Sequence, residues 1–171
     1  YYPDQEFDIR IGSGIETLKP AETDVIVIAG MGGLLIADIL EDDLKKTKSY
    51  KKLILQPRNA QDKLRAWLME NGFQIVDEVL VKEGKYICEI ILAVSGDKST
   101  EIGQLDVDFE ISPILFAKND PLLVEFIENK IRIEKKVYAA IKAGAIQDKA
   151  EKLEKSEERI KVLQELRKRS G

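Results

Sequence analysis

The sequence predicts an α/β fold: a mainly parallel sheet that ends in an antiparallel hairpin, followed by a helical hairpin. Residues 24–29 and 52–56 are continuous apolar runs, each followed by a helical pattern, which is typical of buried strands in a parallel sheet. Residues 73–94 then hold two strand-like segments with no room for a helix between them. From residue 120 onward the apolar pattern has a helical period. Because the apolar strands have no polar face, we expect both faces of this sheet to be covered.

The first part of the chain alternates expected strands with expected helices. The expected strands are residues 7–11, 24–29 and 52–56, and the expected helices are a brief one that ends at Leu18, residues 33–46 and a helix that opens at Asn59 or Gln61. Asn71-Gly72 can end this last helix in the left-handed conformation that glycine favours. Residues 73–81 and 85–94, joined by Lys82-Glu83-Gly84, must pair as an antiparallel hairpin because the connection is too short for a crossover. Residues 106–111 alternate like an exposed strand.

The C-terminal part is expected to form two helices packed as an antiparallel coiled-coil hairpin. Asp120 can cap the first helix, and Gly144 ends it. The second helix covers residues 148–169. The expected seam of the first helix consists of Leu123, Phe126, Lys130, Ile133, Val137 and Ala140, and that of the second of Leu153, Ile160 and Leu163. We therefore expect two domains, residues 1–118 and residues 119–171.

Charge is unevenly distributed along the chain. Residues 130–171 hold 13 Lys and Arg against 7 Asp and Glu, a balance of +6, so residues 1–129 carry −10 within the total of −4. A basic appendage on an acidic body predicts an anionic partner, with nucleic acid the leading candidate. The alternative is a solvated helix surface, because Glu and Lys alternate there at salt-bridging spacing.

Composition excludes several classes of site. The chain has no histidine and one cysteine, Cys88, which rules out a Ser-His-Asp or Cys-His mechanism within the chain and leads us to expect no metal. No window approaches 18 uncharged apolar residues, so we expect no membrane association and a cytoplasmic location. The first residue is Tyr1 rather than Met, from which we expect a processed or truncated chain.

Two segments are candidates for a ligand site at the carboxyl edge of the sheet, where open α/β sheets bind ligands. Gly30-Met31-Gly32-Gly33 directly follows a strand, and glycines there let backbone N–H groups face a ligand. The third glycine of G-x-G-x-x-G would fall at Leu35, so the dinucleotide fingerprint is incomplete. Gln56-Pro57-Arg58 follows the next strand, and its amide and guanidinium suit a flat, hydrogen-bonding ring such as a nucleobase.

These candidates have alternative interpretations. In one, the glycines serve only close strand–helix packing and Gln56 only caps its strand. In another, Arg58 binds the 2′-phosphate of NADP and the protein is an NADP-dependent oxidoreductase, although the antiparallel hairpin argues against this. In a third, the chain is a non-catalytic module that binds RNA or protein. Glu89, in the middle of a strand, is expected to face solvent, with a functional carboxylate as the alternative.

Taken together, the motifs resemble one family. Residues 28–33, 53–57 and 84–91 resemble the corresponding segments of the bacterial tRNA (adenine-N1)-methyltransferases that modify adenine 22. The turn at residues 10–15, the segment Ser112-Pro113-Ile114-Leu115 and the closing helical hairpin fall in the matching order.

The resemblance implies a class I, S-adenosylmethionine-dependent methyltransferase with a Rossmann-like sheet, of which this chain is the C-terminal part, and a coiled-coil domain that helps to hold tRNA. The cofactor is then expected at Gly12, Ser13 and Gly14 and at Ala29, Gly30, Met31, Gly32 and Gly33. The target base is expected beside Gln56, Pro57 and Arg58. Glu89 is the candidate catalytic carboxylate, because a nearby negative charge stabilises the positive charge that develops on the base. The cations expected to bind tRNA are Lys130, Arg132, Lys135, Lys136, Lys142, Lys149, Lys152 and Lys155, clustered near the turn of the hairpin.

The chain departs from the family pattern in three places. Ser13 stands where the family usually has an acidic or amide residue, and Arg58 stands where Asn is usual. The family's first two strands and acidic glycine motif would precede Phe7, and nothing here matches them, so we expect S-adenosylmethionine to bind this chain weakly or not at all. The reaction implied is a direct displacement in which adenine N1 attacks the sulfonium methyl, with the enzyme aligning the two.

Overall fold

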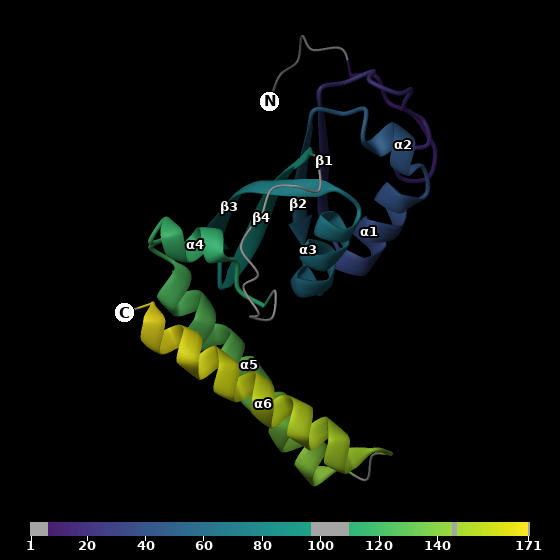
Figure 1. The fold of residues 1–171 in the computed structure, drawn as a ribbon. Helices are drawn as coiled ribbons and strands as arrows, with labels where there is room; N and C mark the ends of the chain where they lie inside the picture. Colours follow the sequence, from purple (N-terminus) through teal and green to yellow (C-terminus); the bar gives the residue numbers. More distant parts are fainter. Residues whose placement is uncertain (1–6, 97–109, 145–146, 171) are drawn as a thin grey trace. The chain divides into compact units, whose positions relative to one another are not determined.

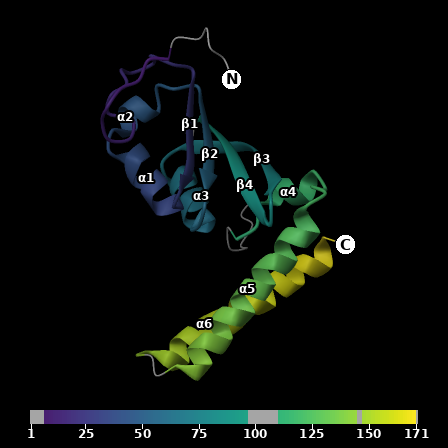
Figure 2. The same cartoon turned by 180° about the vertical axis from the view of Figure 1, so that it is seen from behind.

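A computed structural model describes residues 7–96, 110–144 and 147–170 of the chain (Figures 1 and 2). The strands are β1 (Val25–Met31), β2 (Lys52–Pro57), β3 (Phe73–Glu83) and β4 (Tyr86–Ser95). The helices are α1 (Gly33–Glu41), α2 (Leu44–Thr47), α3 (Gln61–Glu70), α4 (Pro113–Ala117), α5 (Leu123–Ala143) and α6 (Lys149–Arg169). The chain forms two compact units: Tyr1–Asp77 with Ile90–Glu110, and Glu78–Glu89 with Ile111–Gly171. The β3–β4 hairpin contributes its base to the first unit and its tip to the second.

The sheet has the strand order β1-β2-β4-β3. β1 and β2 run parallel, with Ile26 opposite Leu53 and Ile28 opposite Leu55. β4 is antiparallel to β2, and β3 forms the edge after a turn in which Gly84 has φ +59°. The predicted α/β class, the parallel pair and the antiparallel hairpin are therefore confirmed.

Helices α1 and α3 pack against each other on one face of the parallel pair (Figures 1 and 2). The side chains of Ile26 and Ile28 in β1 and of Leu53 and Leu55 in β2 are buried on that face. Val27 points to the other face and is 64% exposed. The expectation that both faces are covered is thus wrong for β1 within the described residues, because the helices that follow β1 and β2 both lie on the same side.

The segment before β1 is irregular. Residues 7–11 form no strand, and the side chains of Phe7, Ile9 and Ile11 are exposed. An extended segment counts as a strand only when a neighbouring strand takes its backbone hydrogen bonds, and the described residues offer it none. The expected brief helix is also wrong: single turns replace it, with Glu16 N–H donating to the carbonyl of Ser13 at 3.0 Å.

The expected helix over residues 33–46 is divided in two. α1 ends at Glu41, and the side chain of Asp43 accepts a hydrogen bond from Lys46 N–H at 3.0 Å, which caps the short helix α2. The predicted helix after β2 is confirmed as α3, and Gly72 follows it with φ +76° as expected.

Helices α5 and α6 form the predicted antiparallel hairpin, with Gly144 at the end of α5 (Figures 1 and 2). The expected seam of α6 is confirmed in part, because Leu163 is buried and Leu153 and Ile160 are half-buried. The expected seam of α5 is buried or half-buried as far as Lys130 and is wrong beyond it, because Ile133 is 59% and Val137 is 42% exposed. The buried and half-buried positions of α5 instead follow the neighbouring stripe of Ile127, Ile131, Glu134, Tyr138 and Ile141.

The tip of the β3–β4 hairpin packs within the second unit. At the outer edge of β3, Leu80 N–H donates to Asp120 Oδ2 at 3.2 Å, and Lys118 Nζ donates to the carbonyl of Glu78 at 3.2 Å. Side chains from the segment between α4 and α5 therefore bind backbone groups that an edge strand would otherwise present to another chain. Lys82 adds an ion pair with Glu125 at 2.7 Å.

Two further expectations, a strand over residues 106–111 and the absence of a membrane span, can be compared with the described residues only. The expected strand over residues 106–111 lies mostly outside the described residues, and Glu110 and Ile111 at its end are buried in a turn. Among the helices that the structure describes, none combines the length and apolar character needed to cross a membrane.

Candidate functional site

The carboxyl ends of β1 and β2 are tied together by hydrogen bonds. Gly30 N–H donates to Gln56 Oε1 at 2.7 Å, and Arg58 N–H donates to the carbonyl of Met31 at 2.8 Å. Gly30 has φ +79°, a conformation that favours glycine, and a Cβ at this position would lie 3.8 Å from Arg58 Nε. The two sequence-predicted segments, the glycine turn and the Gln56-Pro57-Arg58 trio, thus form one edge.

The glycines of the turn at residues 30–33 have different structural roles. Gly33 N–H donates to the carbonyl of Asn59 at 2.9 Å, and a Cβ on Gly33 would lie only 2.5 Å from the carbonyl oxygen of Ala60. Gly33 therefore lets the start of α1 approach the backbone after β2. The expectation that glycine N–H groups here face a ligand is wrong for Gly30 and Gly33, because both groups bind the chain itself.

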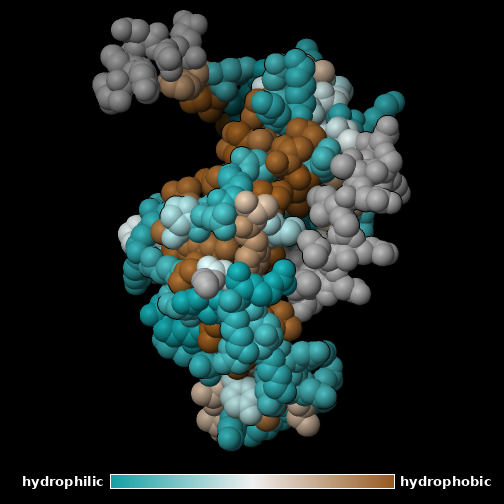
Figure 3. Space-filling model, turned by 60° about the vertical axis from the view of Figure 1, so that its left-hand side comes forward, coloured by the Kyte–Doolittle hydropathy of each residue, from teal (hydrophilic) through white to brown (hydrophobic). Residues whose placement is uncertain are grey.

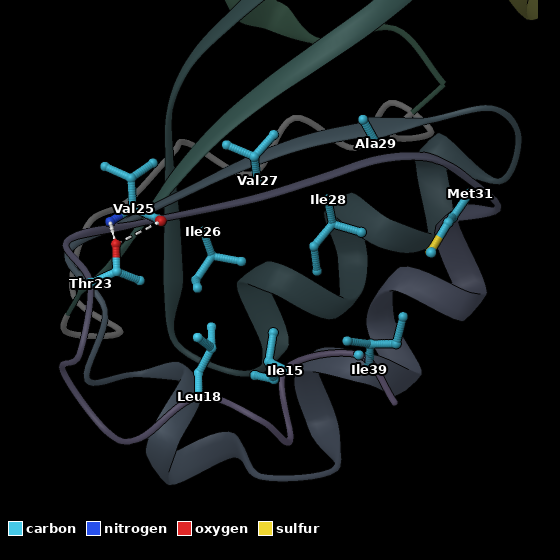
Figure 4. A pocket seen from close by; sticks show the side chains of 11 residues that line it. Ile15, Leu18, Thr23, Val25, Ile26, Val27, Ile28, Ala29, Met31 and Ile39 are labelled. Atoms are coloured by element: carbon cyan, nitrogen blue, oxygen red, sulfur yellow. Dashed lines mark hydrogen bonds between the residues drawn. The ribbon is translucent and has the colours of Figure 1, made fainter. Parts of the chain in front are cut away.

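A hollow of about 440 Å³ lies beside β1 (Figure 4). Ile26 and Ile28 of β1 point toward Ile15, Leu18 and Ile39, which line the opposite wall (Figure 4). The one polar side chain among the described lining residues, that of Thr23, is engaged with the backbone of Val25 (Figure 4). The side chains that line the hollow are therefore almost all apolar, and backbone groups supply the rest of its polar lining.

Gly14, from the turn at residues 12–14, lines this hollow. Gly14 has φ +52°, and a Cβ there would lie 2.7 Å from Ile39 Cγ2, so glycine permits the turn to pack on α1. Ser13 and Gly14 also line a second hollow of about 240 Å³, whose polar residues include Asp38 and Asp42. Gly12 lies apart from both hollows, against Glu16 and Thr17.

Apolar side chains gather on the surface of the unit that holds β1, whereas the helical hairpin is mostly hydrophilic in the same view (Figure 3). The exposed apolar side chains of the first unit include Val25, Val27, Met31, Leu34 and Leu35. All five belong to β1 or to the first turn of α1, so the carboxyl edge of β1 opens onto an apolar surface.

Glu89, the predicted catalytic carboxylate, is buried in the second unit, with 1% of its surface exposed. Its Oε2 lies 4.0 Å from Nζ of Lys130, which also lies over the ring of Phe126 at 5.0 Å. The expectation that Glu89 faces solvent is wrong. The two-residue period of a strand places Glu89 on the same face as the buried Ile91 and Ala93, so this alternation could have revealed its burial.

The predicted tRNA-binding cations lie in different surroundings. Lys149 Nζ donates to the carbonyls of Lys142 and Gly144 at 2.7 and 2.9 Å, and Lys152 Nζ donates to that of Gln147 at 3.1 Å. These two cations thus satisfy carbonyls at the turn of the hairpin. Lys130 belongs to the first half of α5, so the expected clustering of all eight cations near the turn is wrong.

The remaining cations of this set lie on exposed helix surfaces. Lys155 forms an ion pair with Glu151 at 2.5 Å, and the hydrogen bond from Lys155 lowers the pKa of the Glu151 carboxyl. Arg132, Lys135 and Lys136 line a hollow of about 480 Å³ on α5, together with Glu128, Ile131 and Ala139.

Sequence reasoning missed two residues: Asn59, at the edge formed by the glycine turn and the Gln56-Pro57-Arg58 trio, and Ile39, at the hollow beside β1. Asn59 accepts from Gly33, and its Oδ1 would lie 2.9 Å from a Cβ on Gly32. Ile39 forms the packing surface for Gly14. The position of Asn59 directly after the Gln56-Pro57-Arg58 trio was a usable signal, whereas the contact of Ile39 with a turn 25 residues earlier was not visible in any local pattern.

The chain is similar to known proteins over most of its length. The family model described as tRNA (adenine(22)-N(1))-methyltransferase matches residues 4–165. The Bacillus subtilis (strain 168) tRNA (adenine(22)-N(1))-methyltransferase is 30% identical over 161 residues, which are 92% of this chain and 68% of the relative. The crystal structure of the B. subtilis m1A22 tRNA methyltransferase superposes with a TM-score of 0.77 at 30% identity, covering 92% of this chain and 69% of that one. The crystal structure of a Streptococcus pneumoniae putative tRNA (m1A22) methyltransferase in complex with S-adenosyl-L-methionine gives a TM-score of 0.74 at 31% identity. The match covers 92% of this chain and 67% of that one.

Proposed function

Because the chain belongs to the tRNA (adenine(22)-N(1))-methyltransferase family, we propose that it carries the part of the enzyme in which the methyl group of S-adenosylmethionine meets N1 of adenine 22 of tRNA. The family resemblance and the enzyme class predicted from the sequence are confirmed by this membership. The oxidoreductase alternative is not retained. The observation that carries the proposal is the edge formed by Gly30 and Gln56, two residues of the motifs on which the resemblance rests.

The chemistry of the transfer sets what the protein has to supply. N1 of adenine has a free lone pair at neutral pH, so no general base is needed to create the nucleophile. The bound cofactor supplies an electrophilic methyl group on a sulfonium centre. The residues of the chain then have to hold the adenine so that N1, the methyl carbon and sulfur are in line, and to keep water out of the reacting centre.

Gln56 is the best candidate for orienting the adenine. Its Oε1 is held by Gly30 N–H at 2.7 Å, so the plane of the amide is fixed and Nε2 is left as the donor. We assign Nε2–H to an acceptor nitrogen of the target ring other than N1. Pro57 stiffens the backbone directly after Gln56 and is itself buried.

Arg58 requires a different role, because a guanidinium is always charged and would repel both the sulfonium and the methylated, cationic base. Its side chain lies beside Gly30. We assign it to a phosphate of the tRNA strand next to adenine 22, which a planar guanidinium binds well. The assignment of Glu89 as the charge-stabilising carboxylate stays a prediction; its burial beside Lys130 favours a structural ion pair instead.

The residues beside β1 fit part of S-adenosylmethionine. The apolar hollow of about 440 Å³ suits the faces of the adenine ring and the methylene groups of the methionine chain, which Gly14, Ile15 and Ile28 would contact. Ribose hydroxyls are usually bound by an acidic side chain, and none lines this hollow among the described residues. A tRNA substrate further supports our expectation of a cytoplasmic protein.

A methylation assay tests the proposal. The protein is incubated with millimolar S-adenosylmethionine and a tRNA transcript that has adenine or guanine at position 22. We expect methyl incorporation only with adenine 22, seen as a stop in reverse transcription at that position because N1 methylation blocks base pairing. Gln56→Ala should lower kcat/KM by about 100-fold through misalignment of the base. The matched control Gln164→Ala, on the exposed side of α6, should leave kcat/KM unchanged. Equal methylation of the two transcripts would refute the proposal.

A further inference from the structure

We infer that the tRNA backbone docks on one face of α5, formed by Arg132, Lys135, Lys136 and Lys142, and that the cations of α6 serve the hairpin itself. This inference rests on the proposed function, since it assigns the surface that holds the substrate. It narrows the eight cations predicted from the sequence to four.

The cations of α6 are already engaged within the chain. Three of them form ion pairs with acidic residues of the same helix: Lys155 with Glu151, Lys161 with Glu157 and Lys168 with Glu165. Arg159 lies 3.5 Å from Glu134 and Arg167 lies 2.8 Å from Glu128, both on α5. Lys149 and Lys152 bind carbonyls at the turn, and Arg169 lies over the ring of Phe116. Five of these eight cations therefore have a carboxylate partner that compensates their charge, whereas Lys149, Lys152 and Arg169 have neutral partners within the chain.

The cations on the outer face of α5 are different. Lys135, Lys136 and Lys142 are exposed, and their ammonium groups make no ion pair or hydrogen bond with any residue that the structure describes. Arg132 binds the amide oxygen of Asn129 at 2.7 Å, a neutral partner that leaves its charge uncompensated. The charge of this face is therefore available to an anion.

The spacing of these residues places them on one side of the helix. Positions 132, 135, 136 and 142 fall within one face of a helix with 3.6 residues per turn, away from the stripe that packs on α6. They span about 15 Å along the axis, over which a nucleic-acid strand presents several phosphates. Arg132, Lys135 and Lys136 border one shallow, open hollow, so a phosphate could approach all three side chains there.

The same face argues against other anionic partners. A helix that binds a membrane surface needs a broad apolar face beside its cations. Among the described residues of α5, the exposed large apolar side chains are Ile133 and Val137, and the apolar residues at the hollow are Ile131 and Ala139. Glu128, also at the hollow, is bound by Arg167. The chemistry that fits is a hydrophilic, regularly spaced polyanion, which for a member of this family is the tRNA backbone.

Matched triple substitutions test the inference. K135Q/K136Q/K142Q removes three charges from the α5 face, and K155Q/K161Q/K168Q removes three from ion pairs within α6. We expect the α5 triple to weaken tRNA binding at least tenfold and to reduce the slope of log Kd against log salt by about 2 to 3, since each lost phosphate contact removes about 0.7–0.9. In methylation assays the α5 triple should raise KM for tRNA and leave kcat unchanged. The α6 triple should stay within twofold of the unmodified protein in both measurements.

Each other outcome overturns the inference. An equal loss of binding in both triples, or a loss only in the α6 triple, would place the docking surface elsewhere, provided that circular dichroism shows the same helix content in both. Equal competition by polyglutamate and tRNA would make the face a general anion surface. Failure of the proposed function is separable, because it would appear as absent methylation of adenine 22 by the unmodified protein even where tRNA binding depends on the α5 face.

Discussion

In the glycine turn that follows β1, a side chain added at Gly32 would meet very different surroundings from one added at Gly33. A Cβ on Gly33 would press on two backbone carbonyls, those of Asn59 and Ala60, at 2.8 and 2.5 Å. A Cβ on Gly32 would meet the end of the Asn59 side chain at 2.9 Å. A side chain can rotate away, whereas the backbone between β2 and α3 is held by the Arg58–Met31 and Gly33–Asn59 hydrogen bonds.

This difference predicts unequal costs for two conservative substitutions. Gly33→Ala should lower the free energy of unfolding by about 1–3 kcal/mol because the start of α1 has to move away from the carbonyls. Gly32→Ala should cost less than about 1 kcal/mol. Urea denaturation followed by circular dichroism measures both. Equal destabilisation by the two variants would show that Asn59 cannot move and that the packing argument is wrong.

At the other end of the first unit, Arg10 links the irregular segment before β1 to the loop that leads into it. Its guanidinium donates to Asp8 and, through two nitrogens, to Glu22. Hydrogen bonds from Arg10 and from the backbone of Lys19 lower the pKa of Glu22 from 4.5 to about 2. Because the folded-state pKa lies below the ordinary value, the Glu22 carboxylate stabilises the fold above about pH 4.5 and loses this effect as the pH falls toward 2.

Substitution of Glu22 should therefore have a pH-dependent effect. Glu22→Gln should lower the thermal midpoint at pH 7, and its difference from the unmodified protein should shrink steadily between pH 4.5 and 2. The control Glu70→Gln, at an exposed position on α3, should behave like the unmodified protein throughout. Thermal melts at several pH values measure this difference in midpoint. A difference that does not change with pH would show that the charge of Glu22 does not contribute to stability.

Among the secondary-structure elements, α5 carries two apolar stripes that the sequence alone does not rank. One runs through Phe126, Ile133 and Val137, and its first part is covered within the second unit, where Phe126 is 6% exposed. The other, through Ile127 and Glu134, faces α6. There Ser156 Oγ–H donates to Glu134 Oε1 at 2.6 Å in a buried pair, which helps to fix the register of the two helices.

Two isoleucines on this helix give a direct test of the seam. Ile127 is fully buried and Ile133 is 59% exposed. Ile127→Ala should cost about 2–5 kcal/mol in the free energy of unfolding, whereas Ile133→Ala should cost no more than about 0.5 kcal/mol. Both are the same chemical change on one helix, so chemical denaturation compares them directly. A larger cost at Ile133 would restore the seam expected from the sequence.

For the whole molecule, the hollow beside β1 that we propose for the cofactor is lined by apolar side chains and Thr23, with no acidic side chain among its described lining residues. The chain spans 68% of the length of its B. subtilis relative. Its resemblance to an S-adenosyl-L-methionine-bound neighbour extends over 92% of the chain, so the surface beside β1 belongs to a fold that binds this cofactor in a relative.

We therefore expect residues 1–171 to bind S-adenosylmethionine weakly, with a dissociation constant on the order of 1 mM. Burial of the adenine in the hollow should favour binding. The lining residues offer no charged partner to the ribose or to the charged end of the cofactor, so these groups add little to the affinity. Isothermal titration calorimetry measures the affinity, with adenosine as a comparison ligand. A micromolar dissociation constant would contradict this prediction, because it would show that the lining residues of the hollow are enough for tight binding.

The mixed sheet, the antiparallel hairpin and the helical hairpin were predictable because each follows from local patterns. Apolar runs that end in glycine or proline define β1 and β2, and the short Lys82-Glu83-Gly84 link allows no crossover between β3 and β4. The motifs around Gly30 and Gln56 identified the family for the same reason, since both are contiguous in sequence. The contact between these two residues was also predictable, because parallel strands bring their carboxyl ends to one edge.

Only the tertiary structure decided which groups within these elements are used and which are covered. The sequence left the N–H groups of Gly30 and Gly33 available for a ligand. In the structure they donate to the side chain of Gln56 and to the carbonyl of Asn59, respectively. Glu89 is polar, yet the packing of the hairpin tip buries it beside Lys130. The two stripes of α5 are almost equally apolar, so the choice between them depended on where α6 and the hairpin tip pack. Periodicity describes a side chain's direction on its own element, whereas burial depends on a partner that is distant in sequence.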